Sequence, residues 1–106
     1  MLNEIQIRVL NSLMDSDENV EEIKNILKNI DKYIVDDAQI IQTLLFLFEN
    51  KYIACILPQY DEKEKRYFPY EISSPDITKM QDYWFKLLSK GRIEVNKECY
   101  NPYFSE

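Results

Sequence analysis

Apolar side chains recur at intervals of three and four residues through the first fifty positions, a spacing that predicts three amphipathic helices. The first helix is expected from Asn3 to about Met14, and the second from Asn19. The third is expected from Asp36 to near Asn50. Each helix start is an Asn or Asp followed three positions later by Gln or Glu, which predicts a capping box. The third helix is apolar around most of its circumference, so it is largely buried or presents an apolar stripe to a partner.

The apolar stripes identify the residues that are expected to face the core. In the first helix the stripe consists of Leu2, Ile5, Val9, Leu10 and Leu13. In the second helix it consists of Val20, Ile23, Ile26, Leu27 and Ile30. On the side of the second helix opposite this stripe lies a row formed by Lys24, Lys28 and Lys32. This row is either a solvated face paired with Glu21 and Glu22 or a stripe that faces phosphates.

The second half of the chain changes to β-branched and aromatic runs, which predict strands. Residues 51–57 form the first expected strand, which Pro58 should stop. Residues 67–72 form a second extended segment, interrupted by Pro69, and residues 83–87 form the last strand. A short helical turn is expected between the second and third of these segments.

Two serines are expected to cap short helices in this half. Ser74 precedes a proline, a pattern that predicts a helical turn with Ser74 as its cap. Ser89 is expected to cap a C-terminal helix that contains Gly91, the only glycine of the chain. An aromatic tail, residues 100–106, follows and can pack on its own domain or on a second copy.

Two junctions in the chain carry a resemblance to a known family. The strand-to-helix junction at residues 85–92 and the helix-to-strand junction at residues 49–53 are similar to those of bacterial winged-helix regulators. The chain departs from these regulators at Leu88, where Thr is common, and at Asn50 or Lys51, where Gly is common. The chain therefore resembles a winged helix-turn-helix domain, and the resemblance covers nearly all of it.

The resemblance implies an α+β fold in which a three-helix bundle is followed by a small antiparallel β wing and a short C-terminal helix. Residues 1–106 form one winged-helix domain on this interpretation, with the three-helix core at 1–50. The wing is enlarged and occupies 51–88, and the C-terminal helix and aromatic tail occupy 89–106. In this family the third helix enters the major groove of DNA, and homodimers form through terminal helices.

The amino-acid composition limits the reactions that this chain could catalyse and the cofactors it could bind. A chain of 106 residues, 45% apolar, has the size of one domain with a single core. It has no histidine and two separated cysteines, Cys55 and Cys99, which are expected to be free thiols. We therefore expect no catalytic residues, no metal and no cofactor, and hence no enzyme. The start of the chain lacks signal-peptide features and no apolar run spans a bilayer, so we expect a cytoplasmic protein with no membrane partner.

The charge is −6, and residues 1–60 carry most of it, with 5 basic and 10 acidic side chains. Acidic balance opposes attraction to phosphate backbones. The third helix, which should read bases, has neither Lys nor Arg. Its expected outward residues are Asp37, Gln39, Gln42, Thr43, Phe46 and Asn50. Gln42 and Asn50 can read adenine, whereas Asp36 and Asp37 are explained as caps.

The wing offers the alternative electrostatic contact with DNA. Lys63, Lys65 and Arg66, with Tyr67 beside them, are placed to touch a backbone. Three acidic residues are interleaved with them, so the segment is either a solvated loop tip or a weak phosphate contact.

Aromatic residues favour protein recognition instead. Phe46 places an apolar group where a groove-reading helix usually has a polar one. Tyr83 and Trp84 are neighbours on a strand and cannot both be buried on one face. We therefore expect a non-catalytic recognition module that binds a protein or its own copy as a homodimer. The alternatives are a DNA-binding regulator of transcription and an acidic decoy for a nucleic-acid site.

Overall fold

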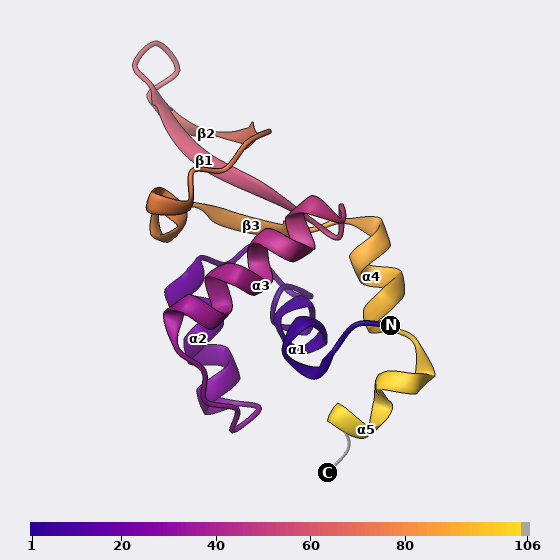
Figure 1. The fold of residues 1–106 in the computed structure, drawn as a ribbon. Coiled ribbons are helices and arrows are strands. Elements are labelled where there is room, and N and C mark those ends of the chain that lie inside the picture. The colour runs from indigo at the N-terminus through magenta and orange to yellow at the C-terminus, as the bar shows by residue number, and fades with distance from the viewer. Residues whose placement is uncertain (105–106) are drawn as a thin grey trace.

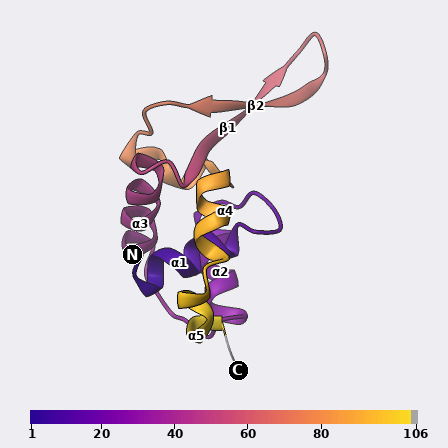
Figure 2. The ribbon, with the colours of Figure 1, turned by 90° about the vertical axis from the view of Figure 1, so that its right-hand side faces the viewer.

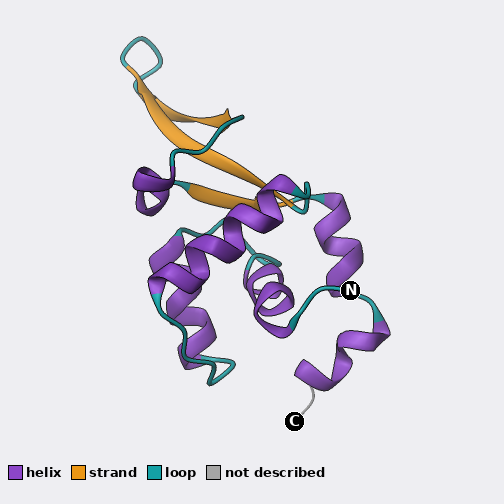
Figure 3. Cartoon of the chain, in the orientation of Figure 1, coloured by secondary structure: helices purple, strands orange, loops and turns teal. Residues whose placement is uncertain are grey.

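The computed structural model describes residues 1–104 and joins a helical part to a three-stranded antiparallel sheet (Figures 1 and 3). The three N-terminal helices are α1 (Glu4–Ser12), α2 (Val20–Asn29) and α3 (Asp37–Glu49). Their predicted caps are confirmed, and α1 and α3 have complete capping boxes. At α2 the structure shows one of the two hydrogen bonds of a capping box, in which the Asn19 side chain accepts the Glu22 N–H. The predicted α+β layout is thereby confirmed.

The core lies among α1, α2, α3 and the base of the sheet, and it confirms most of the predicted stripes. Ile7 is fully buried although it lies off the predicted stripe, because α1 is covered on several sides. Ile30 was predicted to face inward, and this is wrong, since 73% of its surface is exposed. The helix ends at Asn29, and the turn that follows directs Ile30 away from the core.

The sheet has the strand order β2-β1-β3. Its strands are β1 (Ile53–Asp61), β2 (Arg66–Ile72) and β3 (Trp84–Leu87). The predictions that Pro58 stops the first strand and that Pro69 interrupts the second are wrong. The two prolines lie opposite each other in the β1–β2 register. The pairing of β3 with β1 ends at Ile56, so no third strand needs an N–H from Pro58.

Beyond Ile56, β1 and β2 form a two-stranded projection that we call the arm, residues 57–70 (Figure 1). Both views show the arm extending away from the helices, and it contributes to the 49 Å long axis of the molecule (Figure 2). At its tip Asp61 pairs with Arg66 across a four-residue turn in which Lys65 has a φ of 52°. The arm corresponds to the distal part of the predicted enlarged wing.

The segment between β2 and β3 contains the 3-10 helix η1 (Ile77–Asp82). The prediction that Ser74 caps this turn is wrong. Asp76 caps this turn instead, because its carboxylate accepts hydrogen bonds from the N–H and hydroxyl of Thr78. The hydrogen bonds from Thr78 lower the pKa of the exposed Asp76 carboxyl. Tyr83, directly after the turn, is buried, whereas Trp84 is half-buried, as the alternation of a strand predicts.

Helix α4 (Ser89–Val95) follows β3 and packs on α1. The predicted cap at Ser89 is wrong because Ser89 is already the first helical residue. Leu88 takes the N-cap position, and no side chain caps the helix there. The Leu88 N–H donates to the Tyr52 carbonyl at 3.0 Å, so the strand pairing continues into the helix start.

The C-terminal tail consists of η2 (Glu98–Tyr100) and α5 (Asn101–Phe104) and packs on its own chain (Figure 2). Tyr100 is buried, and its hydroxyl accepts the Leu2 N–H at 2.9 Å. Residues 105–106 of the predicted tail lie outside the described residues. The element order and the three-stranded sheet are compatible with a winged-helix-like fold.

Candidate functional site

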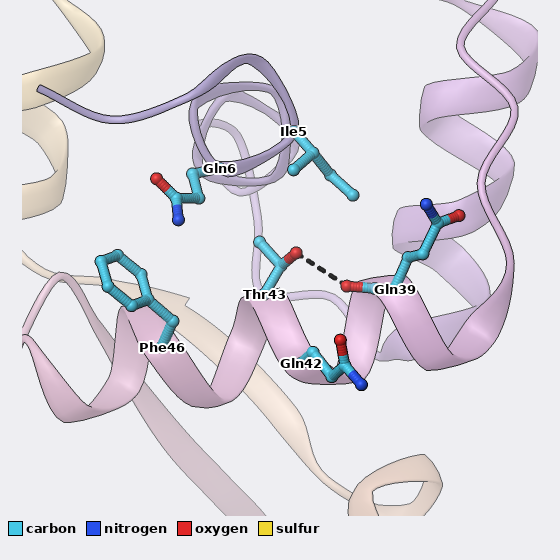
Figure 4. A pocket seen from close by; sticks show the side chains of 6 residues that line it. All are labelled: Ile5, Gln6, Gln39, Gln42, Thr43 and Phe46. Atoms are coloured by element: carbon cyan, nitrogen blue, oxygen red, sulfur yellow. Dashed lines mark hydrogen bonds between the residues drawn. The ribbon is translucent and has the colours of Figure 1, made fainter.

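An open hollow of about 310 Å³ lies between α1 and α3 (Figure 4). Its lining side chains are uncharged and come from the first turn of α1 and from the first turn and middle of α3. They are Ile5, Gln6, Gln39, Gln42, Thr43 and Phe46. Phe46 is 40% exposed at one end of this α1–α3 hollow, so the site combines amide groups with exposed apolar surface.

The capping boxes fix the direction of two amide groups in the hollow. The Gln6 side-chain oxygen accepts the Asn3 N–H at 2.9 Å, and that of Gln39 accepts the Asp36 N–H at 3.1 Å. Each oxygen is occupied by its helix start, so each side chain offers its NH₂ group as a donor. Figure 4 shows the Gln6 nitrogen directed toward α3. The hollow therefore presents hydrogen-bond donors without positive charge.

The structure brings four of the predicted site residues to the hollow. Gln39, Gln42 and Phe46 are exposed, as predicted. The prediction that Thr43 faces outward is wrong, because α1 crosses over it and leaves 7% of its surface exposed. The Thr43 hydroxyl donates to the Gln39 carbonyl at 2.7 Å. Thr43 thus shapes the floor of the hollow.

Asn50 is exposed but serves the end of α3. Its side-chain nitrogen donates to the Phe46 carbonyl at 2.8 Å, so its amide is engaged in capping. Its own carbonyl accepts a hydrogen bond from the Lys90 ammonium at 2.7 Å. These bonds anchor α4 to the end of α3.

The acidic start of α3 has a cationic partner that the sequence did not reveal. Lys24 on α2 forms an ion pair with Asp37 at 3.0 Å. The side-chain nitrogen of Gln81 on η1 donates to the same carboxylate at 3.3 Å. The prediction that Lys24 pairs with Glu21 and Glu22 is therefore wrong, because the packing of α2 against α3 brings Asp37 closer.

The predicted wing residues lie at or next to the tip of the arm, and Figure 1 shows the arm projecting away from α1 and α3, whose residues line the hollow. Lys63, Lys65, Arg66 and Tyr67 are exposed. The Tyr67 ring lies 5.2 Å from that of Tyr60, and Arg66 lies over the ring of Phe68 at 4.4 Å. The residues predicted to bind a partner thus divide into two surfaces.

Sequence reasoning missed the contribution of α1 to the hollow. Ile5 was assigned to the core stripe, and Gln6 was recognised as a capping residue alone. The capping pattern contained the relevant signal, since a Gln that satisfies a cap through its oxygen leaves an outward donor. The Gln6 donor faces α3 only because α1 packs across α3. This packing is a feature of the tertiary structure.

The remaining reactive groups do not converge. Burial raises the pKa of the Cys55 thiol to about 12, so it stays protonated in the core, while Cys99 is exposed. Within residues 1–104, no three His, Cys, Asp or Glu side chains gather as a metal-binding group. The longest helix in this range, α3, has 13 residues and falls short of the roughly 20 that a bilayer crossing requires.

Comparisons with protein-family models, with curated proteins and with solved structures found no match to this chain.

Proposed function

We propose that this protein is a non-catalytic recognition module that binds a polypeptide through the α1–α3 hollow. The observation that carries the proposal is that no charged side chain lines the hollow, although residues 1–60 carry 10 acidic and 5 basic side chains. A surface built for DNA needs cations to displace the counterions of the phosphates. A neutral hollow beside an exposed Phe suits a partner that offers apolar surface.

The donors in the hollow define the polar chemistry of that partner. The Gln6 and Gln39 amides offer N–H groups, and Gln42 is exposed between Gln39 and Phe46. Backbone carbonyls of a peptide, or those at the carboxyl end of a helix, accept such bonds. The proposed partner is therefore a segment that presents carbonyl oxygens next to an apolar side chain, which packs on Phe46.

A DNA-binding regulator is the second candidate. The exposed cations Lys63, Lys65 and Arg66 at the arm tip favour it, as does the resemblance to winged-helix regulators. Two observations oppose DNA binding. The Asn50 side chain caps α3 and is not free to read a base. The start of α3 carries the negative charge of Asp37, which forms an ion pair with Lys24. The arm tip also carries as many acidic as basic residues.

A capture experiment from cells that express the chain tests the proposal. Wild type, Phe46→Asp and the control Ile93→Asp are immobilised in parallel; Ile93 is 66% exposed on α4 and does not line the hollow. We expect a protein that wild type and Ile93→Asp retain and Phe46→Asp loses. With the purified partner, Phe46→Asp should weaken binding at least roughly tenfold, because interface aromatics are frequent hot spots.

Two results oppose the proposal. If Phe46→Asp loses the circular-dichroism signal of the folded chain, Gln42→Lys replaces it as the test of the hollow. If that variant binds the captured protein as wild type does, the hollow is not the binding surface. Tight binding to random duplex DNA at low salt, weakening steeply as salt rises, would favour the regulator.

A further inference from the structure

The first turn of α1 forms one side of the α1–α3 hollow, and the C-terminal tail holds the chain just before that turn. Ile5 and Gln6 line the hollow. Asn3 caps α1, so Leu2 occupies the position that precedes the cap. The Leu2 N–H donates to the Tyr100 hydroxyl at 2.9 Å. The tail therefore fixes the point at which the chain enters α1.

The second hydrogen bond of the Tyr100 hydroxyl commits it to this contact. The hydroxyl donates its single proton to the Glu94 carboxylate at 2.7 Å, so its lone pairs face the Leu2 N–H. Lys97 holds the other Glu94 oxygen, also at 2.7 Å. Tyr100 is buried, with 1% of its surface exposed. A Leu2 N–H that lost this acceptor would be left unpaired in a buried place, which costs free energy.

Apolar packing carries the fixed position of Leu2 into the helix. Leu2 precedes the cap and Ile7 is the fourth residue after it, the two positions that form a hydrophobic staple. Both side chains belong to the buried core. The capping box joins Asn3 to the Gln6 side chain across the same turn. Ile5 and Gln6 lie between the stapled residues, so their direction toward α3 depends on where Leu2 is held.

A second contact joins the tail to α1 at the end of this turn. The Arg8 guanidinium lies 6.0 Å from the centre of the Phe104 ring on α5. Arg8 also pairs with Glu4 in the first turn of α1 at 2.8 Å and with Asp31 after α2 at 3.4 Å. The tail thus meets α1 at Leu2 and at Arg8, on either side of the residues that line the hollow.

We infer that Tyr100 is a positioning residue for the α1–α3 hollow, because it holds the start of α1 so that Ile5 and Gln6 face α3. Tyr100 does not line the hollow and acts on it only through Leu2. Its effect on partner affinity rests on the function proposed above. By linkage, a partner bound in the hollow also strengthens the contact between the tail and α1.

Amide hydrogen exchange of the free chain tests the positioning without any partner. Tyr100→Phe keeps the ring and removes the acceptor of the Leu2 N–H. The Ile7 N–H donates to the carbonyl of the α1 cap at 3.1 Å, and its exchange should become at least roughly fivefold faster. The Ile40 N–H makes the same bond at the start of α3, at 3.2 Å, and should keep its wild-type rate.

Tyr83→Phe is the matched control. Tyr83 is also buried, and its hydroxyl likewise accepts a backbone N–H, that of Asp76 at 3.1 Å. It lies between η1 and β3 and does not line the hollow. The Ile7 rate should stay unchanged in this variant. The inference is overturned if Tyr100→Phe leaves the Ile7 rate unchanged or accelerates Ile7 and Ile40 equally, or if Tyr83→Phe accelerates Ile7 as strongly.

Partner binding separates the inference from the proposed function. Tyr100→Phe should bind the protein captured by wild type roughly fivefold more weakly, and Tyr83→Phe should bind it as wild type does. If Phe46→Asp still binds that protein, the proposed function fails, while the Ile7 rate still decides the positioning. If Phe46→Asp loses the protein and Tyr100→Phe binds it fully, the tail has no influence on the hollow and the inference fails.

A second variant covers the case in which Tyr100→Phe does not fold. Phe104→Ala removes the contact of α5 with Arg8 and leaves the Tyr100 hydroxyl in place. We expect faster exchange of the Ile7 N–H in this variant as well, with the Ile40 rate unchanged. An Ile7 rate equal to that of wild type in folded Phe104→Ala would count against the inference.

Discussion

At the scale of the residue, the single glycine lies where two elements touch rather than where the backbone turns. A Cβ atom on Gly91 would lie 2.5 Å from the Tyr52 carbonyl oxygen and 2.6 Å from a methyl of Leu87. The Leu87 side chain can rotate, but the carbonyl is held because it accepts the Leu88 N–H. Gly91 thus allows α4 to approach the start of the sheet.

Gly91→Ala should lower the free energy of unfolding by about 1–3 kcal/mol, because the added methyl forces α4 away from the Tyr52 carbonyl. Urea denaturation monitored by circular dichroism measures the change. Ile93→Ala, in the same helix at an exposed position, should stay within about 0.5 kcal/mol of wild type. Equal stabilities of Gly91→Ala and wild type would show that α4 adjusts freely.

At the scale of the element, the turn from α3 into β1 is a Schellman motif. The Tyr52 N–H donates to the Leu47 carbonyl and the Lys51 N–H to that of Phe48, both at 3.0 Å. Lys51 has a φ of 63°, the left-handed conformation that favours glycine. Among the described residues, all three with positive φ are lysines, the others being Lys32 and Lys65. The chain therefore forms its sharp turns at some cost in backbone strain.

Replacing Lys51 by glycine should raise the free energy of unfolding by about 0.5–1 kcal/mol, since glycine adopts this conformation without a Cβ clash. Lys51→Ala is the matched control, because alanine removes the same exposed side chain but keeps the clash. Thermal denaturation of both variants measures the difference. The motif would not limit stability if the glycine variant melted at or below the temperature of the alanine variant.

At the scale of the whole molecule, one buried cluster ties the two ends of the described chain together. The Tyr100 hydroxyl accepts the Leu2 N–H and donates to the Glu94 carboxylate at 2.7 Å. Lys97 forms an ion pair with the other Glu94 oxygen, also at 2.7 Å. Burial alone would raise the pKa of Glu94, but the hydrogen bonds from Lys97 and Tyr100, together with nearby positive charge, lower it.

Glu94 should therefore make folding stability depend on acid pH. Because its pKa is lower in the folded chain than in the unfolded chain, its contribution is complete above the unfolded pKa. That contribution is lost as pH falls through the folded pKa. Glu94→Gln should be about 1 kcal/mol less stable than wild type near pH 7, and the difference should narrow in acid.

Denaturant titrations from neutral to acid pH measure the difference between Glu94→Gln and wild type. Glu98→Gln, at an exposed position one turn further on, is the control and should follow wild type across the range. A gap that stays constant at every pH would mean that the Glu94 charge has no role.

Local sequence patterns were enough to predict the α+β layout, the three N-terminal helices and the residues that cap them. Apolar spacing and capping boxes act between residues close in the chain, so local patterns reveal them. Asn3 and Asp36 were recognised with their Gln partners for this reason. The exposed positions of Gln39, Gln42 and Phe46 follow from the same helical period.

Features that depend on partners distant in sequence could be seen only after the chain had folded. Pro58 and Pro69 were predicted to break their strands. Both are accommodated because no neighbouring strand lies where their missing N–H groups would have to donate. Lys24 reaches Asp37, and Ile5 and Gln6 complete the α1–α3 hollow, because helix packing brings separate elements together. The tail packs on its own chain because the Tyr100 hydroxyl accepts a hydrogen bond from Leu2, near the opposite end of the sequence. Such contacts depend on three-dimensional proximity, which no local pattern encodes.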